Sequence, residues 1–237
     1  MSRTLLSKRS FCIASGISGI AGVALLVLSF AINAGPPPGT NSADLIRFGE
    51  QNYANVLWGA WLQAVGPVLI VLFAFSLVHL AGAAQRVGGW MAFFGATILM
   101  TVSLIEITFY ISALHALPEI MPPVSLVLIS AVQHLYFIVA APALFFPLGV
   151  VLLSSSILPR LFGYLALLLG VVFAALGAVF MPTLTLPMGV TAFGGVQALW
   201  WLAAAITLIF RSGELDTAEE INKSPVNTQV SENTGYR

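Results

Sequence analysis

The stretch that decides the fold runs from residue 55 to residue 81 and reads NVLWGAWLQAVGPVLIVLFAFSLVHLA. It contains no aspartate, glutamate, lysine or arginine along its whole length. A helix of about 20 apolar residues is long enough to cross the roughly 30 Å of hydrocarbon in a bilayer. The stretch therefore predicts a helix that spans a membrane.

Five further runs of the same kind occur along the chain, at residues 11–34, 89–113, 125–153, 161–181 and 189–210. Hydrophobic residues make up 59% of the chain and charged residues only 8%, whereas a soluble domain carries about 25% charged residues. Most of the outer surface must therefore face lipid. The predicted fold class is all-α: a polytopic bundle of six spans over residues 11–210, preceded by a short N-terminal segment, 1–10.

The first apolar run also resembles a signal peptide, because Arg3, Lys8 and Arg9 precede it. However, the run 11–34 is longer than the apolar region of about 7–15 residues that signal peptides carry, and its last residues, 31–34, form a poor cleavage site. We expect a retained first span, with cleavage as the alternative.

The charges between the spans predict an orientation. The two joints around Arg86 and Arg160 each hold one arginine and no acidic residue, and Arg211 follows the last span. The other connections, 35–54, 114–124 and 182–188, hold three acidic residues against a single arginine. Because lysine and arginine near span ends stay in the cytoplasm, both termini are expected there, in a cytoplasmic membrane.

Two segments outside the spans are distinctive. In the first outer connection Ser42 is expected to cap a short helix, with Asp44, Arg47 and Glu50 spaced three apart on one face. We expect this amphipathic segment to lie on the outer membrane surface. Residues 211–237 are polar and poor in apolar side chains, which predicts a disordered cytoplasmic tail.

Polar side chains within the spans occur at one predicted depth. Glu106 lies about seven residues from the outer end of its span, and Gln63, Gln133, His134 and Gln197 lie at comparable positions in three others. With a rise of 1.5 Å per residue, all of them fall roughly 10–14 Å below the outer boundary. Such residues are costly in lipid and normally face a protein interior or a cavity.

The first hypothesis for this layer is a site that binds a small molecule or a lipid, in a transporter-like or accessory membrane protein. Glu106 would carry a proton or hydrogen-bond the ligand, in a site formed by Glu106, His134, Gln63 and Gln197, with Tyr110 and Trp61 as walls. In a second hypothesis the protein is a scaffold or anchor, and the polar groups only hydrogen-bond helices to one another. In a third, Glu106 and His134 act as the acid–base pair of an intramembrane enzyme.

A metal site is a further alternative. His115 and Glu119 are four residues apart, and Glu106 and His134 are expected below them, which would supply two imidazoles and two carboxylates. Pro118 interrupts any helix that would align the first pair, and the spacing matches no zinc signature. We therefore expect no metal.

No cofactor or nucleic-acid partner is expected either. His79 and His134 are predicted near opposite membrane faces, so they do not suit bis-histidine ligation of a haem. Cys12 is the only cysteine, which excludes an internal disulfide or a thiolate cage.

The net charge of zero, without a basic block, disfavours nucleic-acid binding. No protease or nucleotide-binding motif occurs. The lipid bilayer is thus the one partner that the sequence itself predicts; protein partners stay open.

Three features carry a resemblance to a known group: the proline- and glycine-rich exit from the first span, the segment SADLIRF at 42–48, and the opening LWGAWL at 57–62. With these, the region 11–211 resembles a family of uncharacterised bacterial six-span membrane proteins, classed as a domain of unknown function. The resemblance implies a six-span architecture and a bacterial cytoplasmic membrane. It implies no activity and no site residues.

Overall fold

The computed structural model describes residues 7–33, 35, 41–115, 121–180 and 188–216. Every regular element within these ranges is a helix, which confirms the all-α class. In chain order the elements are α1 (Lys8–Ile32), α2 (Ser42–Gln51), α3 (Tyr53–Leu80), α4 (Val87–His115), α5 (Met121–Leu135), the π-helical segment η1 (Tyr136–Ala140), α6 (Ala141–Leu153), α7 (Arg160–Phe180) and α8 (Met188–Phe210).

Six helical stretches are long and apolar enough to cross a membrane, at Lys8–Ile32, Tyr53–Leu80, Val87–Ser112, Val127–Leu153, Arg160–Phe180 and Phe193–Phe210. Large apolar side chains lie exposed around the outside of the bundle, among them Leu72, Phe94, Leu168 and Phe210. Such a surface suits lipid and not water. The architecture is that of a multi-pass membrane protein.

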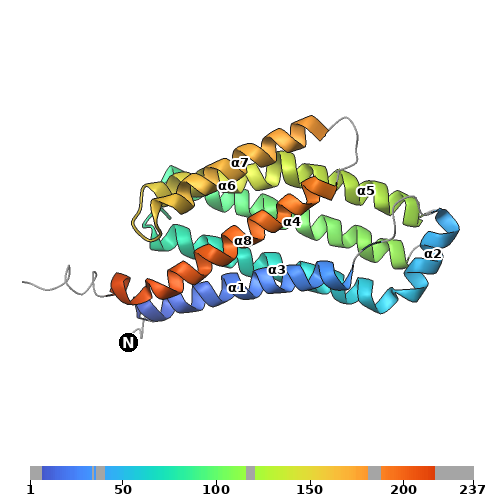
Figure 1. The fold of residues 1–237 in the computed structure, drawn as a ribbon, viewed down its shortest axis with the longest axis horizontal. Helices are drawn as coiled ribbons and strands as arrows, with labels where there is room; N and C mark the ends of the chain where they lie inside the picture. Colours follow the sequence, from blue (N-terminus) through green and yellow to red (C-terminus); the bar gives the residue numbers. More distant parts are fainter. Residues whose placement is uncertain (1–6, 34, 36–40, 116–120, 181–187, 217–237) are drawn as a thin grey trace, which may run out of the picture.

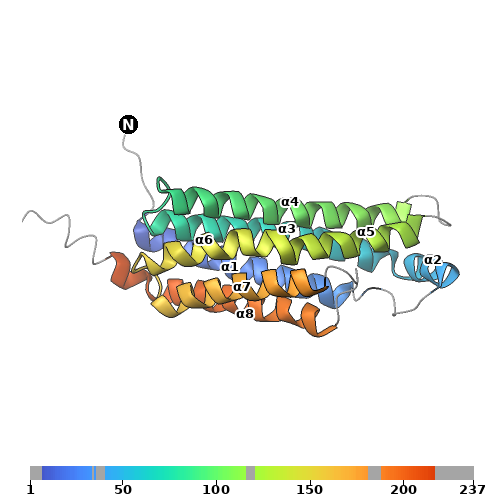
Figure 2. The same ribbon diagram turned by 90° about the horizontal axis from the view of Figure 1, so that it is seen from above.

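The helices run lengthwise in one elongated bundle (Figure 1). α1 packs against α3 and α8, α4 packs against α3 and the α5–η1–α6 segment, and α6 packs against α7. α2 lies at one end of the bundle, and the start of α1, the α6–α7 connection and the end of α8 lie at the other (Figure 2). We call these the α2 end and the arginine end, since Arg86, Arg160 and Arg211 belong to the second.

Aromatic side chains fill the centre of the bundle and join α3, α6, α7 and α8. The ring of Phe145 lies 5.5 Å from that of Trp201 and 6.2 Å from that of Phe173, between centroids. Trp201 also contacts Phe73 at 6.0 Å and Trp200 at 4.7 Å. Lipid is as apolar as these side chains, so close packing is what stabilises their contact.

The fourth span, predicted over 125–153, is not one regular α-helix. A π-helical turn, η1, separates α5 from α6, and the Ala141 N–H donates to the carbonyl of Tyr136, five residues back. Pro142 follows at once, and it has no N–H to donate to the carbonyl of Ile138. The lost bond explains why the helix widens at this point.

The polar segments outside the spans also differ in detail. The N-cap of α2 is Asn41, one residue before the predicted Ser42, and its side chain accepts from the Asp44 N–H at 2.9 Å. Asp44 and Arg47 form the expected pair at 3.5 Å. The polar tail begins with a helical turn over 212–216, where Asp216 accepts from the backbone N–H of Arg9. The rest of the tail, 217–237, lies outside the described residues.

Candidate functional site

Three polar side chains from three helices meet inside the bundle. Gln63 on α3 donates from Nε2 to Oε2 of Glu106 at 2.9 Å, and Gln133 on α5 donates from Nε2 to Oε1 of Glu106 at 3.0 Å. Glu106 belongs to α4, which lies between the other two helices. Each carboxylate oxygen therefore receives one N–H from a different helix. We call Gln63, Glu106 and Gln133 the Glu106 cluster.

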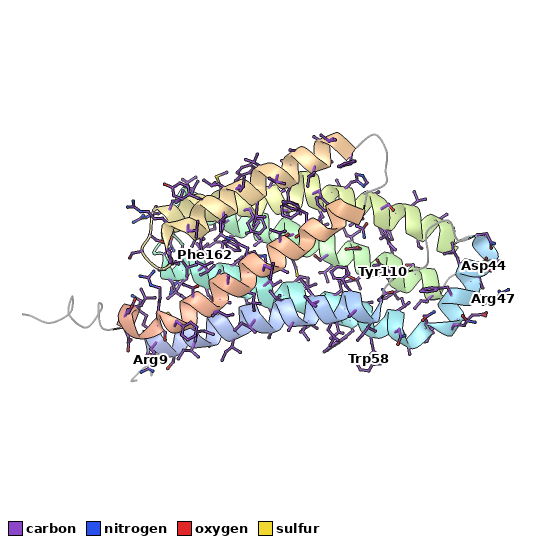
Figure 3. All side chains as sticks on the ribbon, in the orientation of Figure 1. Arg9, Asp44, Arg47, Trp58, Tyr110 and Phe162 are labelled. Atoms are coloured by element: carbon purple, nitrogen blue, oxygen red, sulfur yellow. The ribbon has the colours of Figure 1, made fainter. Side chains whose placement is uncertain are left out.

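The burial of the cluster is uneven. Gln63 is 4% exposed, whereas Glu106 and Gln133 are partly buried. Tyr110 lies one turn further along α4 on the same side and is also partly buried (Figure 3). Its role as a wall of a site stays a prediction.

No positive charge neutralises Glu106 among the described residues. The ion pairs found there lie elsewhere, at Arg47 with Asp44 and at Arg211 with Glu214. A carboxylate accepts hydrogen bonds and donates none, so two carboxamide donors complement it without cancelling its charge. The group best suited to complete the cluster is a hydrogen-bond donor or a cation.

Trp61 lies away from the cluster. Its side chain is 53% exposed and pairs edge-to-face with Trp58, with ring centroids 6.0 Å apart, on the outside of α3. Figure 3 shows Trp58 at the outer edge of the bundle. Two residues along a helix turn the side chain by about 200°, so Trp61 and Gln63 point to nearly opposite sides.

Gln197 belongs to a second polar contact. The Tyr136 hydroxyl on η1 donates to Oε1 of Gln197 on α8. Gln197 is 8% exposed, and Tyr136 packs its ring against Phe173 at 6.0 Å. This contact joins η1 to α8 and does not include Glu106.

His134 is buried, at 2% exposed, and faces two backbone carbonyls. Its Nδ1 lies 2.7 Å from the Ser130 oxygen on its own helix, and its Nε2 lies 3.2 Å from the Phe180 oxygen at the end of α7. A neutral imidazole has one N–H, so it donates to one of these carbonyls at a time. Phe180 is the last residue of α7, so His134 lies next to one of the terminal carbonyls of that helix.

The acid–base enzyme and the metal site both require Glu106 and His134 to lie together, and the structure does not join these two side chains. No hydrogen bond joins the two side chains in the part of the chain that the structure describes, because Gln133 and not His134 faces Glu106. Within the same part, no three histidine, cysteine or acidic side chains gather as they would around a metal. Glu119 and the side chain of His115 lie outside the described residues.

Two members of these contacts were absent from the predicted site: Gln133, which was assigned only to the polar layer, and Tyr136. They are three residues apart, a spacing that places side chains on one side of a helix. That spacing was the available signal, although η1 begins between them and alters the regular period. Comparisons of the chain with models of protein families, with curated proteins and with solved structures found no match.

Proposed function

We propose that this membrane protein binds a small molecule or lipid at the Glu106 cluster, as a transporter-like or accessory subunit. One observation carries the proposal: a carboxylate inside a span is held by Gln63 and Gln133, and no cationic side chain of the described residues is paired to it. Acidic residues within spans are rare and typically mark substrate, ion or proton pathways.

Energetics supports a ligand. A charged side chain at a helix centre costs about 2.5–3.5 kcal/mol in the membrane, whereas one interhelical hydrogen bond there returns about 0.6–2 kcal/mol. Two such bonds offset the cost only in part when each lies in the lower half of that range. In that case a proton, an ammonium group or another donor on Glu106 would supply the remainder.

Native mass spectrometry of the detergent-purified protein tests this. We expect mass beyond the polypeptide, in stoichiometric amount, that disappears in Glu106→Gln, which keeps the shape of the side chain and removes its charge. The matched control is Glu214→Gln, because Glu214 is acidic, 74% exposed and outside the spans. An adduct stoichiometry in Glu106→Gln that equals that of wild type contradicts the proposal, and so does a wild-type protein without any adduct.

The second candidate is a scaffold or anchor without a ligand. It is favoured by the internal pairing of the polar groups, because both oxygens of Glu106 and the amide of Gln197 already have partners. A wild-type mass equal to that of the bare polypeptide would support it, together with a melting temperature that is lower in Glu106→Gln than in wild type.

The location that we propose is a bacterial cytoplasmic membrane with both termini in the cytoplasm. The support is the gathering of Arg86, Arg160 and Arg211 at one end of the bundle, together with the resemblance to the bacterial six-span family.

A further inference from the structure

The arginine end of the bundle carries a pocket of about 600 Å³. Four segments enclose it: the end of α3, the end of α6 with the connection 154–159, the start of α7, and the end of α8. The α6–α7 connection and the end of α8 lie close together at this end in both ribbon views (Figures 1 and 2). The pocket lies far along the bundle from the Glu106 cluster and uses none of its residues.

The lining of the pocket contains both apolar and polar side chains. Ile157 and Leu158 are 4% and 2% exposed and supply apolar groups. Of the three lining serines, Ser154 and Ser155 donate to the carbonyls of Val151 and Leu152, and Ser156 is exposed. A lining of both kinds is compatible with the junction between the acyl chains and the headgroup of a phospholipid.

Two arginines supply positive charge, and the described lining contains no acidic residue. Arg160 is exposed and has no ion pair or hydrogen bond through its side chain to another described residue. Arg211 is oriented: Nη1 donates to the Ile157 carbonyl at 3.2 Å and Nε donates to Glu214 at 3.3 Å. Glu214 is 74% exposed, so solvent weakens its neutralising effect on Arg211.

Other features of the pocket also suit an anion. α7 begins at Arg160, so the positive end of its helix dipole lies at the rim. The Ser156 hydroxyl has no hydrogen-bond partner among the described residues and can donate to an oxyanion. Guanidinium groups match phosphate oxygens in geometry and charge, and basic pockets between spans at the cytoplasmic side hold the headgroups of anionic lipids.

We propose that this pocket binds a phosphate group, carried by an anionic phospholipid headgroup or present as free phosphate, with Arg160 and Arg211 as its charged contacts. The proposal does not depend on the function proposed for the Glu106 cluster, since the two sites share no residue. Loss of the ligand from one site therefore does not imply loss of the ligand from the other site.

The test uses native mass spectrometry of the full chain in detergent, titrated with phosphatidylglycerol or with phosphatidylcholine. The informative variant is Arg160→Gln, because it removes a charge without breaking an ion pair or side-chain hydrogen bond of the described residues. The matched control is Arg86→Gln, at the same end of the bundle but outside the pocket. Arg160→Lys keeps the charge and serves as the conservative variant.

We expect wild type and Arg86→Gln to prefer phosphatidylglycerol, and Arg160→Gln to bind it about tenfold more weakly, as expected for one lost charge-assisted contact. Arg160→Lys should retain most of the preference. Inorganic phosphate at millimolar concentration distinguishes the sources: competition with the lipid and a raised melting temperature, both lost in Arg160→Gln, indicate free phosphate, whereas lipid binding that phosphate does not displace indicates the headgroup.

Two results would overturn the proposal. One is equal binding of the two lipids with no effect of inorganic phosphate on wild type. The other is an Arg160→Gln variant that matches Arg86→Gln in every titration. Because the Arg160 side chain makes no ion pair or hydrogen bond within the described residues, we expect its variants to fold, which a melting temperature equal to that of wild type will verify.

Discussion

Glu106 shows how one residue can be held inside an apolar bundle. Its two oxygens accept from Gln63 and Gln133, which belong to helices on either side of α4. Removal of one donor leaves a buried acceptor unpaired, at a cost of about 1–3 kcal/mol. The three side chains therefore form a coupled unit, and the effect of changing one depends on the others.

A double-mutant cycle measures this coupling. Gln133→Leu should lower the free energy of unfolding by about 1–3 kcal/mol in the wild-type background. In the Glu106→Leu background the same change should have a smaller effect, because its partner is already gone. The measurement is reversible unfolding in mixed micelles, with the difference between backgrounds expected at about 0.6–2 kcal/mol.

Gln197→Leu is the control for that cycle. Gln197 bonds Tyr136 and not Glu106, so its effect should be the same in both backgrounds. An equal effect of Gln133→Leu in the two backgrounds would show that the contact between Gln133 and Glu106 contributes nothing to stability.

At the scale of elements, glycines allow the helices to approach one another closely. A Cβ at Gly95 on α4 would lie 2.1 Å from the backbone oxygen of Ala143 on α6, and a Cβ at Gly177 on α7 would lie 2.5 Å from a side-chain carbon of Ile138 on η1. Small residues at such contacts are what allow spans to pack in lipid. The glycine stripe of α7 at 163, 170 and 177 meets α6 and η1 in this way.

Gly95→Ala should therefore be destabilising. The methyl group would meet backbone atoms that cannot rotate away, so α4 and α6 must separate, at a cost of about 1–3 kcal/mol. Gly195→Ala on α8 is the matched control, because a Cβ there meets nothing within 4 Å. It should be neutral, or stabilising by up to about 1 kcal/mol through helix propensity. Thermal unfolding of both variants tests this, and equal melting temperatures would contradict the close approach at Gly95.

At the scale of the whole molecule, the two ends of the bundle differ in their charged residues. Arg9, Arg86, Arg160 and Arg211 lie at the arginine end, while α2 carries Asp44, Arg47 and Glu50 at the other (Figure 3 labels Arg9, Asp44 and Arg47). This distribution predicts that the arginine end faces the cytoplasm.

Labelling of introduced cysteines tests the orientation. In intact cells a membrane-impermeant maleimide should label Arg47→Cys, whereas Ser156→Cys should react only after the membrane is opened. The native Cys12 is 0% exposed, so background labelling should be low. The reverse pattern would overturn the predicted orientation, and labelling of both variants in intact cells would show that the protein inserts in two orientations.

The sequence by itself determined the class and the six spans of this protein. Length and apolarity are local properties, so a run such as 55–81 predicts a span without knowledge of its neighbours. Counting along each run also placed Gln63, Glu106 and Gln133 at one depth, since rise per residue is constant. Pro142 is a sequence signal for the widening of the helix at η1, because a proline inside a span removes a backbone hydrogen bond.

Only the tertiary structure decided which residues meet at that depth. Neighbours such as Gln133 and His134 point about 100° apart, and a rotation of the helix exchanges them. In a soluble protein the apolar stripe of each helix indicates its inward face, but a span is apolar on all sides and has no such stripe. The choice of Gln133 for Glu106, the position of His134 under α7, and the pocket at the arginine end all depend on packing between segments distant in the chain.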